Sequence, residues 1–381
     1  MVPMTGSTAG PTRLAFFGHN ANEPAVRRRA QFFERAGIAV VGIMPHRGTP
    51  KPAPFPLHTL GQTRDNSYLA RLRTVLQAAK LSTAHHPDLR EPDVIYARNL
   101  DMLICAHAFA RRNRLRVPIV YECLDIHRLM IGDGPAARSL RAIEGALLAR
   151  SALLVCSSTQ FIEQYFARYH TGKYRALLVE NRVDPADVGP RPSALTRTGA
   201  PMRLGWIGNL RCRRSLDLLR QLSATFHPRL AIHIHGYPAR HVFPDFEQQI
   251  ADSPGLQYFG PYDGAADLAR IYGDLDAVWA ADWFEAGHNS VWQIPNRIYE
   301  GGYFGVPAIT ADGTETARMT QSWGAGWRFA NPPETTVPPL IESILSDPAQ
   351  ITRRRDALLA LPSATFAESP EDTRAIIAAA L

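Results

Sequence analysis

The chain has 381 residues, of which 45% are hydrophobic and 20% charged, the composition of a globular protein with room for two domains. No apolar run approaches the ~18 residues that a transmembrane helix needs, and the first dozen residues lack the pattern of a signal peptide. Four cysteines lie far apart without a CxxC pair, which excludes a disulfide scaffold or a zinc knuckle and favours reduced thiols in a cytosolic protein.

The net charge of +7 is divided unevenly along the chain. Residues 1–183 hold 25 Lys and Arg against 13 Asp and Glu, a net +12, whereas the remainder holds 17 against 22, a net −5. Such a basic half suits phosphates or an anionic membrane surface, although a solvated basic face is the alternative. Nucleic acid is disfavoured, because the chain has no helix-turn-helix, zinc-finger or aromatic RNA-binding pattern.

Short apolar runs alternate with amphipathic stretches in residues 1–183, the pattern of a parallel sheet covered by helices. The expected strands are 14–17, 40–43, 94–96, 119–121, 153–155 and 177–179. The expected helices are 25–36, 68–79, 101–112 and 136–150. Residues 184–201 are rich in Pro, Gly and small polar residues, which predicts a linker.

The alternation restarts after the linker. The expected strands are 203–207, 231–234, 257–259, 277–280, 307–310 and 326–329, and Gly208 is expected to open a turn into a helix at 213–222. The segments RLAFFG and RLGWIG begin the two halves alike. We therefore predict an α/β fold of two tandem Rossmann-like domains with a cleft between them. Their bounds are 1–183 and 202–362, and a C-terminal helix in 363–381 packs back on the first domain.

Two motifs of the second half have the chemistry of a nucleotide site. Gly208 precedes Arg211, Arg213 and Arg214 at a helix start, where a diphosphate would meet free N–H groups and positive charge. Solvated surface arginines are the alternative. Glu300 lies in a helix followed by two glycines and is placed to accept ribose hydroxyls, unless it is a surface carboxylate beside glycines needed only for packing.

The loop after strand 277–280 offers polar groups between aromatic side chains, which suits a sugar. Glu285 and Asn289 are our candidates there. His288 with Glu285 provides too few ligands for a metal ion, so no metal site is expected.

Polar residues also follow the strands of the first half. Asp125 is our first candidate for a general base and His19 is the second. The two could also act as a pair, in which Asp125 orients the His19 imidazole. For each residue the alternative is a structural role in a turn or as a helix cap. The candidate acceptor-side residues are Arg98, Asp101 and Glu122.

Taken together, these motifs resemble the GT-B glycosyltransferases of the group-1, family 4-like kind. LVENRV (178–183) resembles the segment that leads from the first domain of that family to the second. GNLRCRRS (208–215) resembles its phosphate loop, with Arg214 at the diphosphate and Asn209 in place of the first basic residue, so that Arg211 or Arg213 compensates. IPNRIYEGGYFGVPAI resembles its nucleotide helix, with Glu300 at the ribose and Asn296 and Arg297 also on the donor. Trp292 stands where the family usually has a second Glu.

More narrowly, YARNLDML, VYECLDIHRL and WFEAGHNS resemble the glucosyltransferases of succinoglycan-type exopolysaccharide assembly. This resemblance implies transfer of a sugar, expected to be glucose, from a UDP donor to a polyprenyl-diphosphate-linked oligosaccharide with a β-linkage. It further implies an inverting, metal-independent enzyme without a cofactor, peripheral at the inner face of the cytoplasmic membrane. Residues 68–81, with Arg71, Arg73 and Lys80, are the expected membrane contact, or else an ordinary surface helix.

Two other functions remain compatible with the motifs. A nucleotide-sugar epimerase of the same fold would act on the donor alone. A non-catalytic carbohydrate-binding protein would bind the donor without turnover, whereas a nicotinamide oxidoreductase lacks its dinucleotide fingerprint here.

Overall fold

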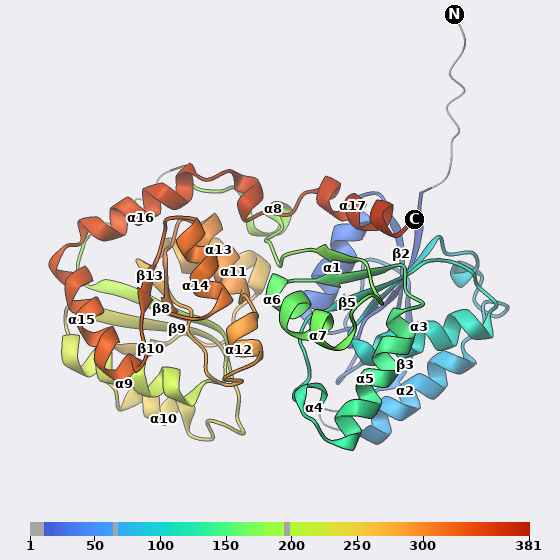
Figure 1. Ribbon diagram of the computed structural model, residues 1–381. Helices are drawn as coiled ribbons and strands as arrows, with labels where there is room; N and C mark the ends of the chain where they lie inside the picture. Colours follow the sequence, from blue (N-terminus) through green and yellow to red (C-terminus); the bar gives the residue numbers. More distant parts are fainter. Residues whose placement is uncertain (1–10, 64–67, 194–198) are drawn as a thin grey trace, which may run out of the picture. The chain divides into compact units, whose positions relative to one another are not determined.

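The computed structural model describes residues 11–63, 68–193 and 199–381, with the backbone alone at 68–72 and 265. The chain forms two compact units (Figure 1). Unit 1 comprises the chain up to Ser157, Phe161–Val179 and Ser369–Leu381, and unit 2 comprises Ser158–Gln160 and Glu180–Glu368. Within the described residues, no helix combines the length and the apolar character needed to cross a bilayer.

As far as the chain is described, the sheet of unit 1 has seven parallel strands in the order β3-β2-β1-β4-β5-β6-β7. They are β1 (Arg13–Phe17), β2 (Ala39–His46), β3 (Leu57–Gln62), β4 (Val94–Arg98), β5 (Ile119–Cys123), β6 (Leu153–Cys156) and β7 (Ala176–Leu178). The central strands are apolar along most of their length because helices cover both faces of a parallel sheet. The expected parallel α/β sheet is confirmed.

The helices of the first half alternate with these strands. They are α1 (Pro24–Arg35), α2 (Tyr68–Lys80), η1 (Pro87–Leu89), α3 (Leu100–Arg112), α4 (Arg128–Ile131), α5 (Pro135–Leu148), α6 (Thr159–Phe161), η2 (Ile162–Phe166) and α7 (Ala167–Tyr169). The last helix, α17 (Pro370–Ala380), belongs to unit 1, where Ile376 and Ile377 join the buried cluster that contains Phe16 and Phe33. Its Arg374 Nη1 donates to the carbonyl oxygen of Ala36 over 3.2 Å.

Among its described residues, unit 2 repeats the arrangement with six parallel strands in the order β10-β9-β8-β11-β12-β13. They are β8 (Met202–Leu210), β9 (Leu230–Pro238), β10 (Leu256–Tyr258), β11 (Ala277–Trp279), β12 (Ala308–Ala311) and β13 (Trp327–Phe329). Its helices are α8 (Pro185–Val188), α9 (Arg213–Phe226), α10 (Phe246–Ala251), α11 (Gly264–Gly273), α12 (Asn289–Trp292), α13 (Asn296–Tyr303), α14 (Glu315–Ser322), α15 (Pro333–Ser346), α16 (Ala349–Ala360) and η3 (Ser363–Thr365).

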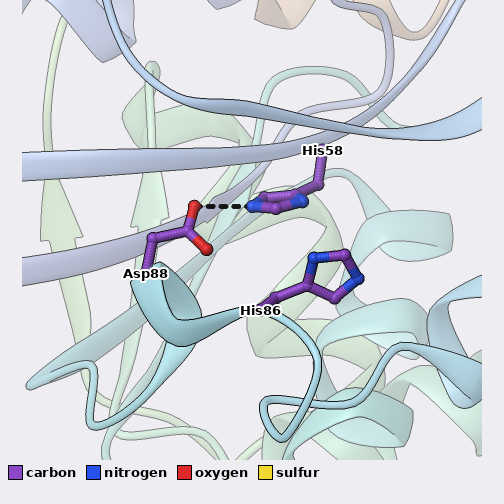
Figure 2. Close-up of side chains that lie close together, drawn as sticks. All are labelled: His58, His86 and Asp88. Atoms are coloured by element: carbon purple, nitrogen blue, oxygen red, sulfur yellow. Dashed lines mark hydrogen bonds and ion pairs between the residues drawn. The ribbon is translucent and has the colours of Figure 1, made fainter.

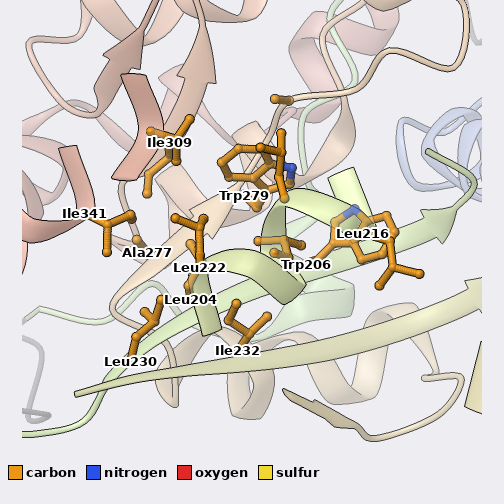
Figure 3. Packing of buried hydrophobic residues seen from close by; sticks show 14 of the residues in the cluster. Leu204, Trp206, Leu216, Leu222, Leu230, Ile232, Ala277, Trp279, Ile309 and Ile341 are labelled. Carbon is orange, nitrogen blue, oxygen red and sulfur yellow. The ribbon is translucent and has the colours of Figure 1, made fainter. Parts of the chain in front are cut away.

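Two buried clusters cover the two faces of this second sheet. Trp206 and Trp279 point to the face packed by the leucines of α9 and by Ile341 of α15 (Figure 3). Their neighbours Ile207 and Val278 point to the opposite face, which belongs to the other cluster. Successive side chains of a strand point to opposite faces of the sheet, and here both sets are buried because helices cover both faces.

Three features differ from the sequence-based expectation. The edge strand β3 was not expected, because only Leu60 of its six residues is buried and no apolar run marks it. Gly208 does not open a turn: β8 continues through it to Leu210, alongside β9. The segment 184–201, expected to be a linker, contains the short helix α8, capped by the Asp184 side chain.

Candidate functional site

The carboxyl end of β8 contains a close approach of two backbones. Gly208 has φ +109° and its register partner Gly236 has φ +137°, values that side-chain-bearing residues rarely adopt. A Cβ atom on Gly236 would lie 1.9 Å from the carbonyl oxygen of Gly208, so the strand pair requires glycine there. A Cβ on Gly208 itself would meet no atom within 4 Å, which leaves its outer side open.

A pocket of about 480 Å³ follows at the start of α9. It combines positive charge with aromatic surface and is lined by Arg211, Cys212, Arg213, Arg214, Asp217, Leu218, Gln221, Val242, Trp283, Phe284 and Glu334. The guanidinium of Arg211 lies 4.9 Å from the ring centroid of Phe284, and that of Arg214 lies 5.0 Å from Trp283. Such stacking restricts the rotation of both arginine side chains and leaves their positive charge available to a ligand.

The arginines of this pocket have different partners. Arg214 donates from Nε and Nη2 to the two carboxylate oxygens of Glu334, over 2.8 and 2.9 Å. Arg211 Nε lies 3.6 Å from an oxygen of Asp282. Arg213 instead donates to Gln249 and to the carbonyl oxygen of Val242, which holds it to the neighbouring loop. Arg211 and Arg214 are therefore better placed for a ligand than Arg213.

Buried groups fix the start of α9 against the loop after β11. The Cys212 sulfur accepts hydrogen bonds from the backbone N–H of Ser215, over 3.4 Å, and of Trp283, over 3.2 Å. Ser215, which is fully buried, donates to the carbonyl of Ala281 over 3.0 Å and accepts from Trp279 Nε1 over 3.1 Å. These contacts set the position of the arginines relative to the aromatic loop.

The same loop contains the expected sugar-binding pair. Asn289 is 2% exposed and donates from Nδ2 to the Glu285 carboxylate over 2.7 Å. The backbone N–H of Glu285 donates to Ser290 Oγ over 2.9 Å. The structure thus brings Glu285 and Asn289 together and fixes the carboxylate at the amino end of α12.

Helix α13 holds the remaining donor-side candidates. Asn296 is its first residue, half-buried, and Arg297 donates to the carbonyl oxygen of Trp279 over 3.3 Å. Glu300 is 7% exposed and accepts a hydrogen bond of 2.8 Å from the hydroxyl of Tyr272. Burial, together with the charge of Glu300, raises the pKa of that tyrosine, so it donates to the carboxylate at neutral pH.

In unit 1, His19 follows β1 and pairs with the carboxylate of Glu23, not with that of Asp125. Its Nε2 lies 2.5 Å from the Glu23 carboxylate, four residues ahead, rather than on Asp125. Burial raises the pKa of Glu23, but the hydrogen bond and charge of His19 outweigh burial and bring this pKa below its ordinary value. Asp125 is exposed after β5, and half-buried Asp101 accepts from the N–H of Met102 over 3.0 Å.

Arg98 and Glu122, expected to face an acceptor, are buried instead. Each is 2% exposed, and Arg98 Nε lies 2.5 Å from Glu122 Oε2. Arg98 also donates to the carbonyl oxygen of Ala25 over 2.6 Å, and Arg29 lies 3.6 Å from the other oxygen of Glu122. Charges buried this deeply must be paired with each other, so the Arg98–Glu122 ion pair has a structural role: it holds the carboxyl ends of β4 and β5 together.

No family model matches the chain. The succinoglycan biosynthesis protein ExoL of Rhizobium meliloti (strain 1021) is 39% identical over 316 residues, which cover 81% of this chain and 78% of ExoL. The chain belongs to the ExoL family.

The fold of this ExoL-family chain is shared by solved structures of low sequence identity. HepE from Anabaena, in complex with UDP and glucose, aligns with a TM-score of 0.68 at 15% identity, covering 96% of this chain and 98% of HepE. Sucrose-phosphate synthase from Thermosynechococcus elongatus aligns with a TM-score of 0.70 at 14% identity, covering 97% and 98%. The expected GT-B fold is confirmed.

Three contributors to the site of this ExoL-family chain were not expected from its sequence. Glu334 has no local signal, because it lies in the first turn of α15, far along the chain from Arg214. The sequence predicts that Cys212 is only a small buried residue, whereas its sulfur caps the amino end of α9. Glu23 could have been found from its position four residues after His19, just before Pro24 begins α1.

Proposed function

We propose that this protein is a glycosyltransferase that moves a sugar, expected from the resemblance to be glucose, from a UDP donor to a polyprenyl-diphosphate-linked oligosaccharide in exopolysaccharide synthesis. The observation that carries the proposal is the arginine pocket at the start of α9, which has the charge and aromatic surface for a nucleoside diphosphate. The relative ExoL is named for succinoglycan biosynthesis, and HepE was solved with UDP and glucose, which support the same substrate class.

The leaving diphosphate would bind at Arg211 and Arg214. Positive side chains in the first turn of a helix oppose the helix dipole, and an anion there removes that conflict. Glu334 is the anion that the structure provides, through a pair whose side chains are 41% and 44% exposed. Such an exposed pair contributes about 0–1 kcal/mol, so a more highly charged diphosphate displaces it. Donors aimed at the leaving group then stabilise the transition state by about 3–4 kcal/mol each.

The remaining donor contacts are assigned to residues of unit 2. Glu300 would accept the ribose hydroxyls beside Asn296 and Arg297, while Glu285 and Asn289 would bind those of the sugar. We assign the acceptor to unit 1. A base there takes the proton of the acceptor hydroxyl, whose oxygen attacks the anomeric carbon. The bond to the diphosphate breaks on the opposite face, and UDP leaves with the electron pair. The proposed product is therefore the β-glycoside, formed without a metal ion or cofactor.

The reaction is tested with a panel of UDP- and GDP-sugars, each offered with and without a polyprenyl-diphosphate-linked oligosaccharide. We expect transfer from UDP-glucose only when the acceptor is present, and a β-linkage in the NMR spectrum of the product. An α-linkage would contradict the inverting mechanism. Conversion of the donor without an acceptor would indicate an epimerase, and binding without any conversion would indicate a carbohydrate-binding protein.

The diphosphate site is tested with Arg214→Ala and Glu334→Gln. We expect Arg214→Ala to weaken UDP binding by about tenfold or more, because a charge-assisted contact is lost. Glu334→Gln should tighten binding by up to about fivefold, because the competing carboxylate is neutralised. Calorimetric titration with UDP measures both effects.

The chain provides a matched control for this pair. Arg229 and Glu342 form an equivalent exposed bidentate pair, over 3.0 and 2.7 Å, which does not line the pocket. Arg229→Ala and Glu342→Gln should leave UDP affinity unchanged. Equal losses in Arg214→Ala and Arg229→Ala would mean that Arg214 has no specific part in donor binding.

The general base is tested with Asp125→Asn. We expect kcat to fall about 100-fold or more while UDP affinity stays the same, because Asn cannot accept the proton. Asp133→Asn, an exposed change in the following loop, is the control and should retain full turnover. Normal turnover of Asp125→Asn together with a large loss in His19→Gln would reject Asp125 and assign the base to His19, oriented by Glu23.

We further propose that unit 1 binds the inner face of the cytoplasmic membrane through α2. Leu76 is 52% exposed there, and the exposed Arg73 and Lys80 lie three and four residues from it on one stripe of the helix. An apolar side chain between two cations suits the surface of an anionic bilayer. The Arg71 side chain lies outside the described residues.

Vesicle co-sedimentation tests this membrane contact. We expect binding to vesicles with anionic lipid, weaker binding at high salt, and little binding to neutral vesicles. Arg73→Glu combined with Lys80→Glu should reduce the bound fraction several-fold without changing the far-UV circular dichroism. Equal binding to neutral and anionic vesicles, or undiminished binding of the double variant, would refute the assignment.

A further inference from the structure

Three side chains from two separate segments converge in unit 1, outside the residues assigned above. His58 comes from β3, whereas His86 and Asp88 come from the turn around η1 (Figure 2). One ligand atom from each, two imidazole nitrogens and a carboxylate oxygen, lie within 4.8 Å of one another. His58 Nε2 lies 2.6 Å from Asp88 Oδ2, and the ring centroids of the two histidines are 4.6 Å apart.

The backbone holds both segments in place before any ligand binds. His58 is paired with Ile43 in the register of β3 and β2. On the other side, Pro87 starts the η1 turn, and Leu89 at its end is 1% exposed, which anchors the turn in the core. Arg13 Nη2 donates to the carbonyl oxygen of Asp88 over 3.3 Å, which ties the turn to β1.

The donor set selects a class of cation. Two imidazoles and one carboxylate are typical ligands of zinc and of chemically similar late transition metals, whereas calcium and magnesium prefer oxygen alone. Zinc binds such atoms at about 2.0–2.2 Å in a tetrahedron, so small rotations of these side chains suffice. The side chains of His58 and Asp88 are 19% and 39% exposed, which leaves access for the ion and room for water as a fourth ligand.

The position of the cluster separates it from the proposed chemistry. His58 is the second residue of β3, and η1 precedes β4, so the cluster lies at the amino ends of these strands. His19 and Asp125 follow the carboxyl ends of β1 and β5, so they lie at the opposite end of the parallel strands. A metal ion bound here would join the edge strand to the segment that leads into a central strand.

We propose that His58, His86 and Asp88 form a zinc site that stabilises unit 1 by clipping β3 to the segment before β4. Edge strands are held to the sheet on one side only, and β3 buries little of its side-chain surface, so a cross-link at its start has a large effect. Binding of the ion to the folded chain alone stabilises it by mass action. The inference is independent of the proposed sugar transfer.

The test uses the full chain without a polyhistidine tag, stripped of metal and titrated with Zn²⁺ alone. We expect one Zn²⁺ per chain in competition with a chelating dye, and a rise in Tm of about 5 °C or more at a hundredfold excess over Kd. Co²⁺ in its place should give the intense visible absorption of a tetrahedral centre. His58→Ala and His86→Ala should each weaken Zn²⁺ binding about tenfold or more and reduce the rise in Tm by about half or more at the same Zn²⁺ concentration.

His85→Ala is the matched control, because this exposed neighbour of His86 is not part of the cluster. It should bind Zn²⁺ as the unaltered chain does. Circular dichroism of the metal-free variants is used to check that each variant is folded. Equal Zn²⁺ affinity in the unaltered chain, His58→Ala and His86→Ala would overturn the proposal and leave an ordinary His58–Asp88 ion pair, as would a loss in His85→Ala as large as in His86→Ala.

Discussion

Donor binding in this protein depends on how the positive charge at the start of α9 is paired with an anion. Arg214 lies in the first turn of this helix and Arg211 lies two residues before the helix begins, so both are near the positive end of the helix dipole, where an anion is favoured. The structure provides Glu334 for Arg214 and Asp282 for Arg211, and it stacks both guanidinium groups on aromatic rings. The positive charge is thus assembled in advance at a place where a carboxylate can be exchanged for a diphosphate, which is the electrostatic preorganisation that transfer of a sugar from UDP needs.

Most of the fold could be predicted from the sequence, because buried parallel strands have a strong local signal. The apolar runs that became β1, β4 and β8 are continuous, and the alternation with helices specifies the sheet type. Strand β3 could not be predicted, since an edge strand with one buried residue has almost no hydrophobic pattern. The path of Gly208 also depends on a partner distant in sequence, Gly236, with which it shares a close backbone approach.

The site was predictable only in part, for the same physical reason. Residues at strand ends could be expected to gather at one edge, but their individual partners depend on packing. Glu122 looked available at the end of β5, whereas the buried guanidinium of Arg98 claims its charge. A His19–Asp125 pair was one of the expected arrangements, whereas the structure pairs His19 with Glu23. Ion pairs between distant segments, such as that of Arg214, leave no periodic trace in the chain.

The most direct test is a crystal structure of the chain with UDP. We expect the β-phosphate within hydrogen-bond distance of Arg214 and close to the first turn of α9. The Glu334 carboxylate should then have moved away from the guanidinium, and the ribose should contact Glu300. Density for UDP at another place in the molecule, with the Arg214–Glu334 pair intact, would contradict the proposed donor site.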